Sequence, residues 1–265
     1  MKRKIYFLCT LFITVFCFNC WGGFGDELKK AMDGDADSQY RIGTYYETGY
    51  ECEFDIQKSI KWLKKASDNG HPSAQFLLGI DYLYGKGLKK DGKKALELFK
   101  KSALQGHSFS QNELGEIYLN GEIVKKDYKK AFYWFTKASD NNSSYAKYNL
   151  GNMYYHGNGV AVDLITARTL IQGAAEDGCI YAYGPLGLMY EKGDGCLIDY
   201  VQAYVWLNLS NSTQLNDSKI EKLVDEKLKA LEQKMTTQQI ADAQKLSKEI
   251  DEKARNEFER KALNN

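Results

Sequence analysis

The amino-acid sequence predicts an all-α fold, a right-handed α/α solenoid of 36-residue helical hairpins closed by C-terminal capping helices. The first observation is that several columns of glycine, tyrosine and aspartate recur every 36 residues. The second is an apolar spacing of three and four residues within each repeat, which is typical of amphipathic helices. The third is that 265 residues with 43% apolar side chains can bury a substantial core.

The N-terminus has the pattern of a secretory signal. Cations at residues 2–4 precede an uncharged segment, residues 5–18, and the small residue Gly22 follows. As a helix this segment would rise about 21 Å, short of the roughly 30 Å hydrocarbon core of a bilayer. We therefore expect residues 1–22 to be a signal peptide, cleaved after Gly22, and the mature chain to be periplasmic or secreted. A lipid anchor at Cys20 is the alternative.

Five repeats fill residues 35–210, after a partial repeat at residues 23–34. Each repeat should hold two helices, called helix A and helix B, at about 37–48 and 56–69 in the first repeat. Helix A should end at Gly49 and its counterparts, because glycine adopts the left-handed conformation at little cost. Glycines also close helix B, with Asn142 as the substitute in the third repeat. The aspartates that share the period are Asp55, Asp91, Asp127, Asp163 and Asp199.

A glycine also recurs in the middle of helix A, where it costs about 1 kcal/mol of helix propensity. These glycines are Gly43, Gly79, Gly115, Gly151 and Gly187. We expect close helix contact to offset the cost, with the side chain of Trp62 or Leu98 from helix B approaching the glycine backbone. A single hairpin cannot bury its own apolar stripe, so neighbouring repeats should stack.

The run Ala74-Gln-Phe-Leu-Leu-Gly79, together with Gly85, resembles the Sel-one-like repeat family, which is related to tetratricopeptide repeats. The resemblance covers residues 35–210. It implies a solenoid that serves as an adaptor or regulator of envelope enzymes and signalling complexes. Glu51 and Ile123 depart from the family pattern by replacing the second loop glycine, so those loops should differ locally.

Residues 215–262 lie beyond the repeats and still show helical spacing, as at Leu223 and Leu228. Thr236 and Gln239 match a capping box, which predicts the start of another helix. We expect this segment to be a helical cap that seals the last repeat. A coiled coil that binds a partner is the alternative.

Catalytic and metal sites have little support. Ser144-Tyr-Ala-Lys147 matches the S-x-x-K pattern of serine β-lactamases, and residues 67–69 and 139–141 match S-D-N. The repeat explains both patterns, and no K-T-G element follows. We predict no enzyme activity. The alternative is a β-lactam or peptidoglycan hydrolase, an activity that the resemblance suggests for a cysteine-rich branch of the family.

Three cysteines, Cys52, Cys179 and Cys196, remain after the signal. The number is odd, so at least one thiol should be free, and the sequence leaves the pairing open. The cysteine and histidine spacings match no metal motif, so no metal and no cofactor are expected.

The columns on helix A opposite its buried stripe vary between repeats, which suggests a recognition surface. In a right-handed stack helix A should line the concave side, so these columns should face an extended groove. Alternating aromatic and amide side chains suit a peptide or protein segment. The candidate residues are Tyr40, Arg41, Phe76, Ile80, Tyr84, Asn112, Glu116, Asn120, Tyr148, Asn152 and His156.

The charges balance, with 36 basic against 35 acidic residues. This balance argues against nucleic acid as a partner and limits membrane contact to the export signal. The predicted function is therefore non-covalent binding of a protein or peptide by an exported scaffold. A structural spacer without any partner is the third possibility.

Overall fold

A computed structural model describes residues 23–212 and 218–263, with side chains described for residues 23–212 and 222–256. The chain forms two compact units, Met1–Lys126 and Asp127–Asn265. Every regular element within the described residues is a helix. Successive helices pack as hairpins, which confirms the predicted all-α solenoid fold. The predicted signal peptide at residues 1–22 lies outside the described residues.

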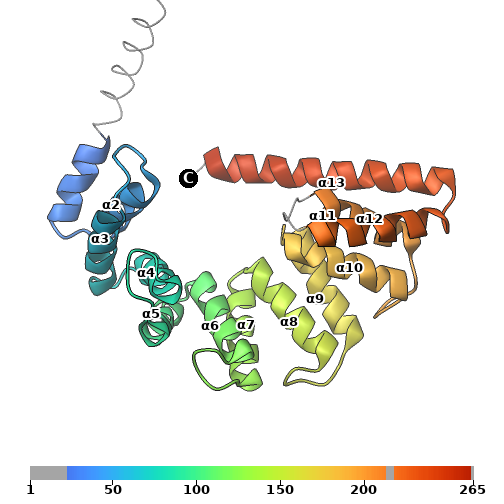
Figure 1. The fold of residues 1–265 in the computed structure, drawn as a ribbon, viewed down its shortest axis with the longest axis horizontal. Coiled ribbons are helices and arrows are strands. Elements are labelled where there is room, and N and C mark those ends of the chain that lie inside the picture. The colour runs from blue at the N-terminus through green and yellow to red at the C-terminus, as the bar shows by residue number, and fades with distance from the viewer. Residues whose placement is uncertain (1–22, 213–217, 264–265) are drawn as a thin grey trace, which may run out of the picture. The chain divides into compact units, whose positions relative to one another are not determined.

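Unit 1 contains a helix over residues 23–32 followed by two complete hairpins and the A helix of the third repeat (Figure 1). Its labelled helices are α2 (Ala36–Thr48), α3 (Ile56–Asp68), α4 (Pro72–Tyr84), α5 (Gly92–Leu104) and α6 (Ser108–Asn120). Helix α2 packs against α3 and α4 packs against α5, while α3–α4 and α5–α6 contacts join the repeats.

Unit 2 continues the same alternation and ends in two helices outside the repeats (Figure 1). Its helices are α7 (Tyr128–Asp140), α8 (Ser144–His156), α9 (Leu164–Glu176), α10 (Ile180–Lys192), α11 (Tyr200–Ser212), α12 (Ser218–Glu232) and α13 (Thr237–Leu263). Within the described residues no helix is both long and apolar enough to cross a bilayer.

The recurring aspartates start the B helices. The side chain of Asp55 accepts hydrogen bonds from the backbone N–H groups of Gln57 and Lys58, at 3.1 and 3.0 Å. Asp91, Asp127 and Asp163 cap α5, α7 and α9 in the same way. Such caps satisfy N–H groups that have no partner inside the helix. The hydrogen bond from Lys58 lowers the pKa of Asp55 most.

The predicted helix ends are confirmed. Gly49 and its counterparts cap the A helices of the five repeats in the left-handed conformation. Asn142 takes the same region with φ 61°, as expected for the glycine substitute. Glu51 also keeps a left-handed conformation, with φ 56°. This is the conformation of Gly87, Gly159 and Gly195 at the corresponding positions of other repeats, so the expected local difference is wrong for the backbone at Glu51.

The central glycines of helix A do permit close helix contact, but the predicted contact residue is wrong by one position. A Cβ on Gly43 would lie 2.9 Å from the side chain of Leu63. On Gly79 it would lie 2.6 Å from the ring of Phe99. Trp62 is instead half-buried, with Lys65 Nζ 4.1 Å from its ring centroid. Leu63 and Phe99 are the residues that fit closely because they point directly at helix A.

The last repeat is covered by α12 and α13, which both pack against α11. Leu228, Leu231 and Ala243 of these helices belong to one buried cluster that reaches back to α9. The predicted capping box is confirmed, because Thr236 N–H donates to Gln239 Oε1 at 2.8 Å and Gln239 N–H donates to Thr236 Oγ1 at 3.2 Å.

Two glycines of unit 2 provide a test of the helix contact. A Cβ on Gly151 would lie 2.5 Å from Ile171 Cγ1, whereas one on Gly173 would meet nothing within 4 Å. We expect Gly151→Ala to lower the free energy of unfolding by about 1–3 kcal/mol through overpacking. Gly173→Ala should raise it by up to about 1 kcal/mol through helix propensity. Urea denaturation followed by circular dichroism measures both. Changes of the same sign in the two variants would contradict the close contact.

Candidate functional site

The residues predicted to bind a partner lie on the A helices of both units, and they differ widely in exposure. In unit 1 they belong to α2, α4 and α6, and in unit 2 to α8. Asn112 is buried, whereas Tyr84 is 71% exposed. The set therefore divides into residues that pack between helices and residues that solvent can reach.

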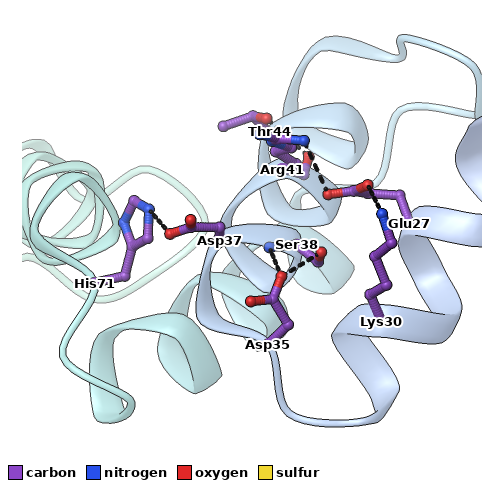
Figure 2. Close-up of polar contacts among 8 residues, drawn as sticks. All are labelled: Glu27, Lys30, Asp35, Asp37, Ser38, Arg41, Thr44 and His71. Atoms are coloured by element: carbon purple, nitrogen blue, oxygen red, sulfur yellow. Dashed lines mark hydrogen bonds and ion pairs between the residues drawn. The ribbon is translucent and has the colours of Figure 1, made fainter.

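Arg41 is exposed and pairs with an acidic residue of the first helix. Its Nη1 lies 3.4 Å from Glu27 Oε1, and Lys30 Nζ lies 3.9 Å from the second oxygen of that carboxylate (Figure 2). Glu27 is only 8% exposed. Arg41 thus holds the helix at residues 23–32 against α2, in addition to any contact with a partner.

Tyr40 packs against the start of the next A helix. Its ring stacks on His71, with centroids 4.5 Å apart. His71 Nδ1 accepts the N–H of Ala74 as the cap of α4, and Nε2 lies 3.2 Å from Asp37 Oδ1 (Figure 2). Burial lowers the pKa of His71. A neutral imidazole ring suits this position, because Nδ1 must be unprotonated to accept the hydrogen bond from the N–H of Ala74.

Phe76 repeats this arrangement one repeat later. Its ring centroid lies 5.1 Å from that of His107 and 5.9 Å from that of Phe109. His107 caps α6 as His71 caps α4. Phe109 is 55% exposed, so the aromatic group around His107 reaches the surface.

A polar cluster lies on α6. Asn112 Nδ2 donates to Glu116 Oε1 at 2.9 Å. Burial and the charge of Glu116 raise the pKa of the neighbouring Glu113 to about 7. Asn112 and Glu116 are therefore in contact, and Asn112 is an interior residue of this unit.

The end of α4 combines exposed and buried groups. Tyr84 is exposed and Ile80 is half-buried, while Asp81 between them is only 2% exposed. Asp81 Oδ2 has no hydrogen-bond partner within the described part of the chain. Burial and the nearby charge of Glu47 raise the pKa of Asp81 to about 6, although Lys86 opposes them. A buried carboxylate without full compensation destabilises the folded state.

In unit 2 the predicted residues form a gradient along α8. Tyr148 is half-buried and packs against the buried cluster. Asn152 is half-buried, and His156 at the helix end is exposed, with its ring 5.0 Å from that of Tyr155. Of the predicted set, Arg41, Tyr84, Asn120 and His156 are exposed. Their role in binding stays a prediction.

A row of side chains that the sequence analysis did not single out links successive helices. Gln39 Nε2 donates to the carbonyl of Ala31 at 3.0 Å, and Gln111 Nε2 donates to that of Ala103 at 3.0 Å. Gln75 does the same toward Ser67 at 3.3 Å. The 36-residue spacing of these glutamines was the available signal. They satisfy carbonyls at the ends of the preceding helices.

The S-x-x-K residues have structural positions. Ser144 is the first residue of α8, and Lys147 pairs with Asp177 at the end of α9. Cys52, Cys179 and Cys196 are all free thiols. Within the described residues no group of three or more histidine, cysteine or acidic side chains could hold a metal ion.

Consecutive helical hairpins that pack on their neighbours along the chain define the class of α-solenoid repeat proteins. The Sel1 repeat model matches this chain over residues 36–71, 72–107, 108–143, 144–179 and 178–211. The chain therefore belongs to the Sel1 repeat family. Repeats of this family generally serve as scaffolds for protein interaction.

Two solved structures illustrate the similarity. A Sel1 repeat protein from Oxalobacter formigenes is 28% identical, with a TM-score of 0.67 over 74% of this chain and 75% of that protein. A protective antigen present in uropathogenic Escherichia coli strains is 29% identical, with a TM-score of 0.58 over 87% of this chain. The present chain spans 56% of that antigen. No protein of curated function matches.

Asp81 provides a test of the buried charge at the end of α4. Its pKa is about 6 in the folded state, above the ordinary 3.8, so its charged form opposes folding at neutral pH. Asp81→Asn should raise the free energy of unfolding by about 1–3 kcal/mol at pH 7.5. The gain should shrink as the pH falls below 6 and vanish below about 4, where the carboxyl is protonated in both states.

Urea denaturation at pH 7.5 and pH 4.0 measures this effect. Asp33→Asn is the matched control, because Asp33 is exposed in the turn after the first helix. Equal effects of the two substitutions at pH 7.5, or an undiminished effect of Asp81→Asn at pH 4.0, would show that the buried charge is not the cause.

Proposed function

We propose that this chain is an exported, non-catalytic scaffold that binds a protein or peptide through its A helices and acts as an adaptor or regulator in the bacterial envelope. The observation that carries the proposal is the exposure of variable A-helix residues on a framework of repeated core residues. Tyr84 shows it best, because a ring that is 71% exposed contributes little to the core.

The chemistry of the exposed residues supports a polypeptide partner. Tyr84 offers rigid apolar area, Asn120 can donate to and accept from a peptide backbone, and His156 adds a ring at the end of α8. The half-buried Ile80 lies on the same helix as Tyr84, and the half-buried Asn152 lies on the same helix as His156.

Export is supported by the sequence of residues 2–22 alone, with its cations, apolar segment and small residues. Cellular fractionation followed by mass spectrometry of the purified chain tests this part. A new N-terminus at Gly23 in the periplasmic or secreted fraction is expected. Recovery of a chain that begins at a lipidated Cys20 would instead show a membrane-anchored protein.

Partner binding is tested by cross-linking and affinity purification from the native envelope. Tyr84→Ala combined with His156→Ala should lower the recovery of the cross-linked partner more than about fivefold, because interface aromatics dominate binding energy. The melting temperature should change by less than about 2 °C, because both side chains are exposed.

Tyr133→Ala is the matched control. This tyrosine is 53% exposed but lies on the B helix α7. Partner recovery should remain at the wild-type level in this control. Unchanged recovery in the Tyr84/His156 variant would refute the A-helix surface, and a similar loss in the Tyr133 variant would show that the surface is misplaced.

A further inference from the structure

The balanced overall charge hides a segregation of charge within unit 1. Helices α3 and α5, the B helices, carry four lysines each and one acidic residue each. The A helices of this unit carry a single basic residue, Arg41. Their acidic residues are Asp37, Glu47, Asp81, Glu113 and Glu116. Positive charge therefore gathers on one kind of helix.

Six of these lysines lie on the solvent sides of α3 and α5, which we together call the lysine face. Its members are Lys61, Lys64 and Lys65 of α3 and Lys93, Lys100 and Lys101 of α5, all of them exposed. They lie on the side of each helix away from its buried residues, which include Leu63 in α3 and Phe99 in α5. The face is thus the solvent side of the two B helices.

The charges of the lysine face are only partly offset, since the exposed Asp68 and Glu97 stand one helical turn from Lys64 and from Lys93 and Lys101. None of the six lysines forms an ion pair with any side chain that the structure describes. Lys65 Nζ instead lies over the ring of Trp62. That contact does not neutralise the positive charge of the lysine. Other lysines of these helices differ, since Lys58 pairs with the capping Asp55.

The loop before α5 brings further cations to the same region. Gln57 Nε2 donates to the carbonyl of Gly87 at 3.0 Å, which ties this loop to the first turn of α3. Lys89 and Lys90 follow in the loop and are exposed. Phe54, which precedes the cap of α3, is 63% exposed. Exposed aromatic rings and lysines are both common at membrane interfaces.

We propose that the lysine face binds the surface of a bilayer that contains anionic phospholipids. The lysines attract the negative headgroups, and their aliphatic stems can lie along the interface while the charges remain hydrated. Attraction of this kind needs a cluster of unneutralised cations and does not need a net positive protein. This surface is separate from the A-helix surface, so the inference goes beyond the proposed function.

The composition of the face favours lipid over other anionic partners. It contains no arginine, whose planar group recognises carboxylates and phosphates through paired hydrogen bonds. Trp62 is half-buried with Lys65 over its ring, so it offers no free platform for stacking a nucleic-acid base. Lysine acts as a point charge and suits the diffuse charge of a lipid surface.

Vesicle co-sedimentation tests the proposal with the full chain. The probes are vesicles of phosphatidylcholine with 30% phosphatidylglycerol and vesicles of phosphatidylcholine alone. We expect binding to the first and not to the second, with release by 0.5 M NaCl because exposed charges are screened. The variant Lys64→Glu, Lys93→Glu, Lys100→Glu should bind more than about 30-fold more weakly, since each lysine near an anionic surface contributes about fivefold.

The matched control is Lys222→Glu, Lys229→Glu, Lys248→Glu, which makes the same charge change at exposed lysines of α12 and α13. It should bind within about threefold of wild type. Glutamine in place of glutamate at residues 64, 93 and 100 gives a milder variant, and thermal unfolding checks that each variant folds.

Three results would overturn the proposal. One is absence of binding to the anionic vesicles, and another is equal binding to both kinds of vesicle. The third is equal loss in the lysine-face and control variants. In another outcome, the wild-type chain fails to bind vesicles and yet is retained by immobilised polyglutamate, with retention lost in the lysine-face variant. That result would overturn the proposal as well and would assign the face to an acidic protein.

Discussion

Burial of apolar side chains between neighbouring repeats is the constraint on which the rest of this structure depends. Leu63 and Ala66 of α3 are buried together with Ala74 of the next repeat, and Leu77 packs against them. In unit 2 a single cluster of buried residues runs from α9 to α13. A hairpin of two 13-residue helices has too little interior to shield these groups alone. Glycines inside helix A tighten each hairpin separately, because they let side chains such as Phe99 of the same repeat approach the backbone.

Because the buried columns hold the fold together, the exposed columns are free to carry function. The core columns, the capping aspartates and the glutamines that bind carbonyls hold the hairpins in register. Residues such as Tyr84 and Lys100 can then vary without loss of the fold, because both are exposed. The two helices of each repeat thereby present different chemistry, with aromatic and amide groups on A and lysines on the B helices of unit 1. The two proposed partners, a polypeptide and a membrane, would thus contact different helices of the repeats.

The sequence predicted most of the helices because the signals were local and repeated. Glycine at the end of helix A and Asn142 after helix B determine conformation through their own backbone preferences. The contact at Gly43 was assigned to Trp62 instead of Leu63, because helical spacing identifies a face but leaves one residue of uncertainty about which side chain points inward.

The candidate site was harder to predict, since variation of a column does not reveal exposure. The column that contains Tyr40 varies among the repeats. Tyr40 itself nevertheless stacks on His71 and helps to join the first repeat to the second. The lysine face was missed for a different reason. Net charge sums over the whole chain and cannot show that cations and carboxylates occupy different helices.

The most direct measurement of the central claim is the far-ultraviolet circular dichroism of a peptide with residues 144–179, which holds the complete α8–α9 hairpin. Without neighbouring repeats, Ala175 and Cys179 would lose the residues of α10 and α11 with which they form one buried cluster. The account predicts a largely unfolded spectrum with no cooperative thermal transition. A helical peptide that melts cooperatively would contradict it, because one repeat would then be sufficient to hide its own apolar face.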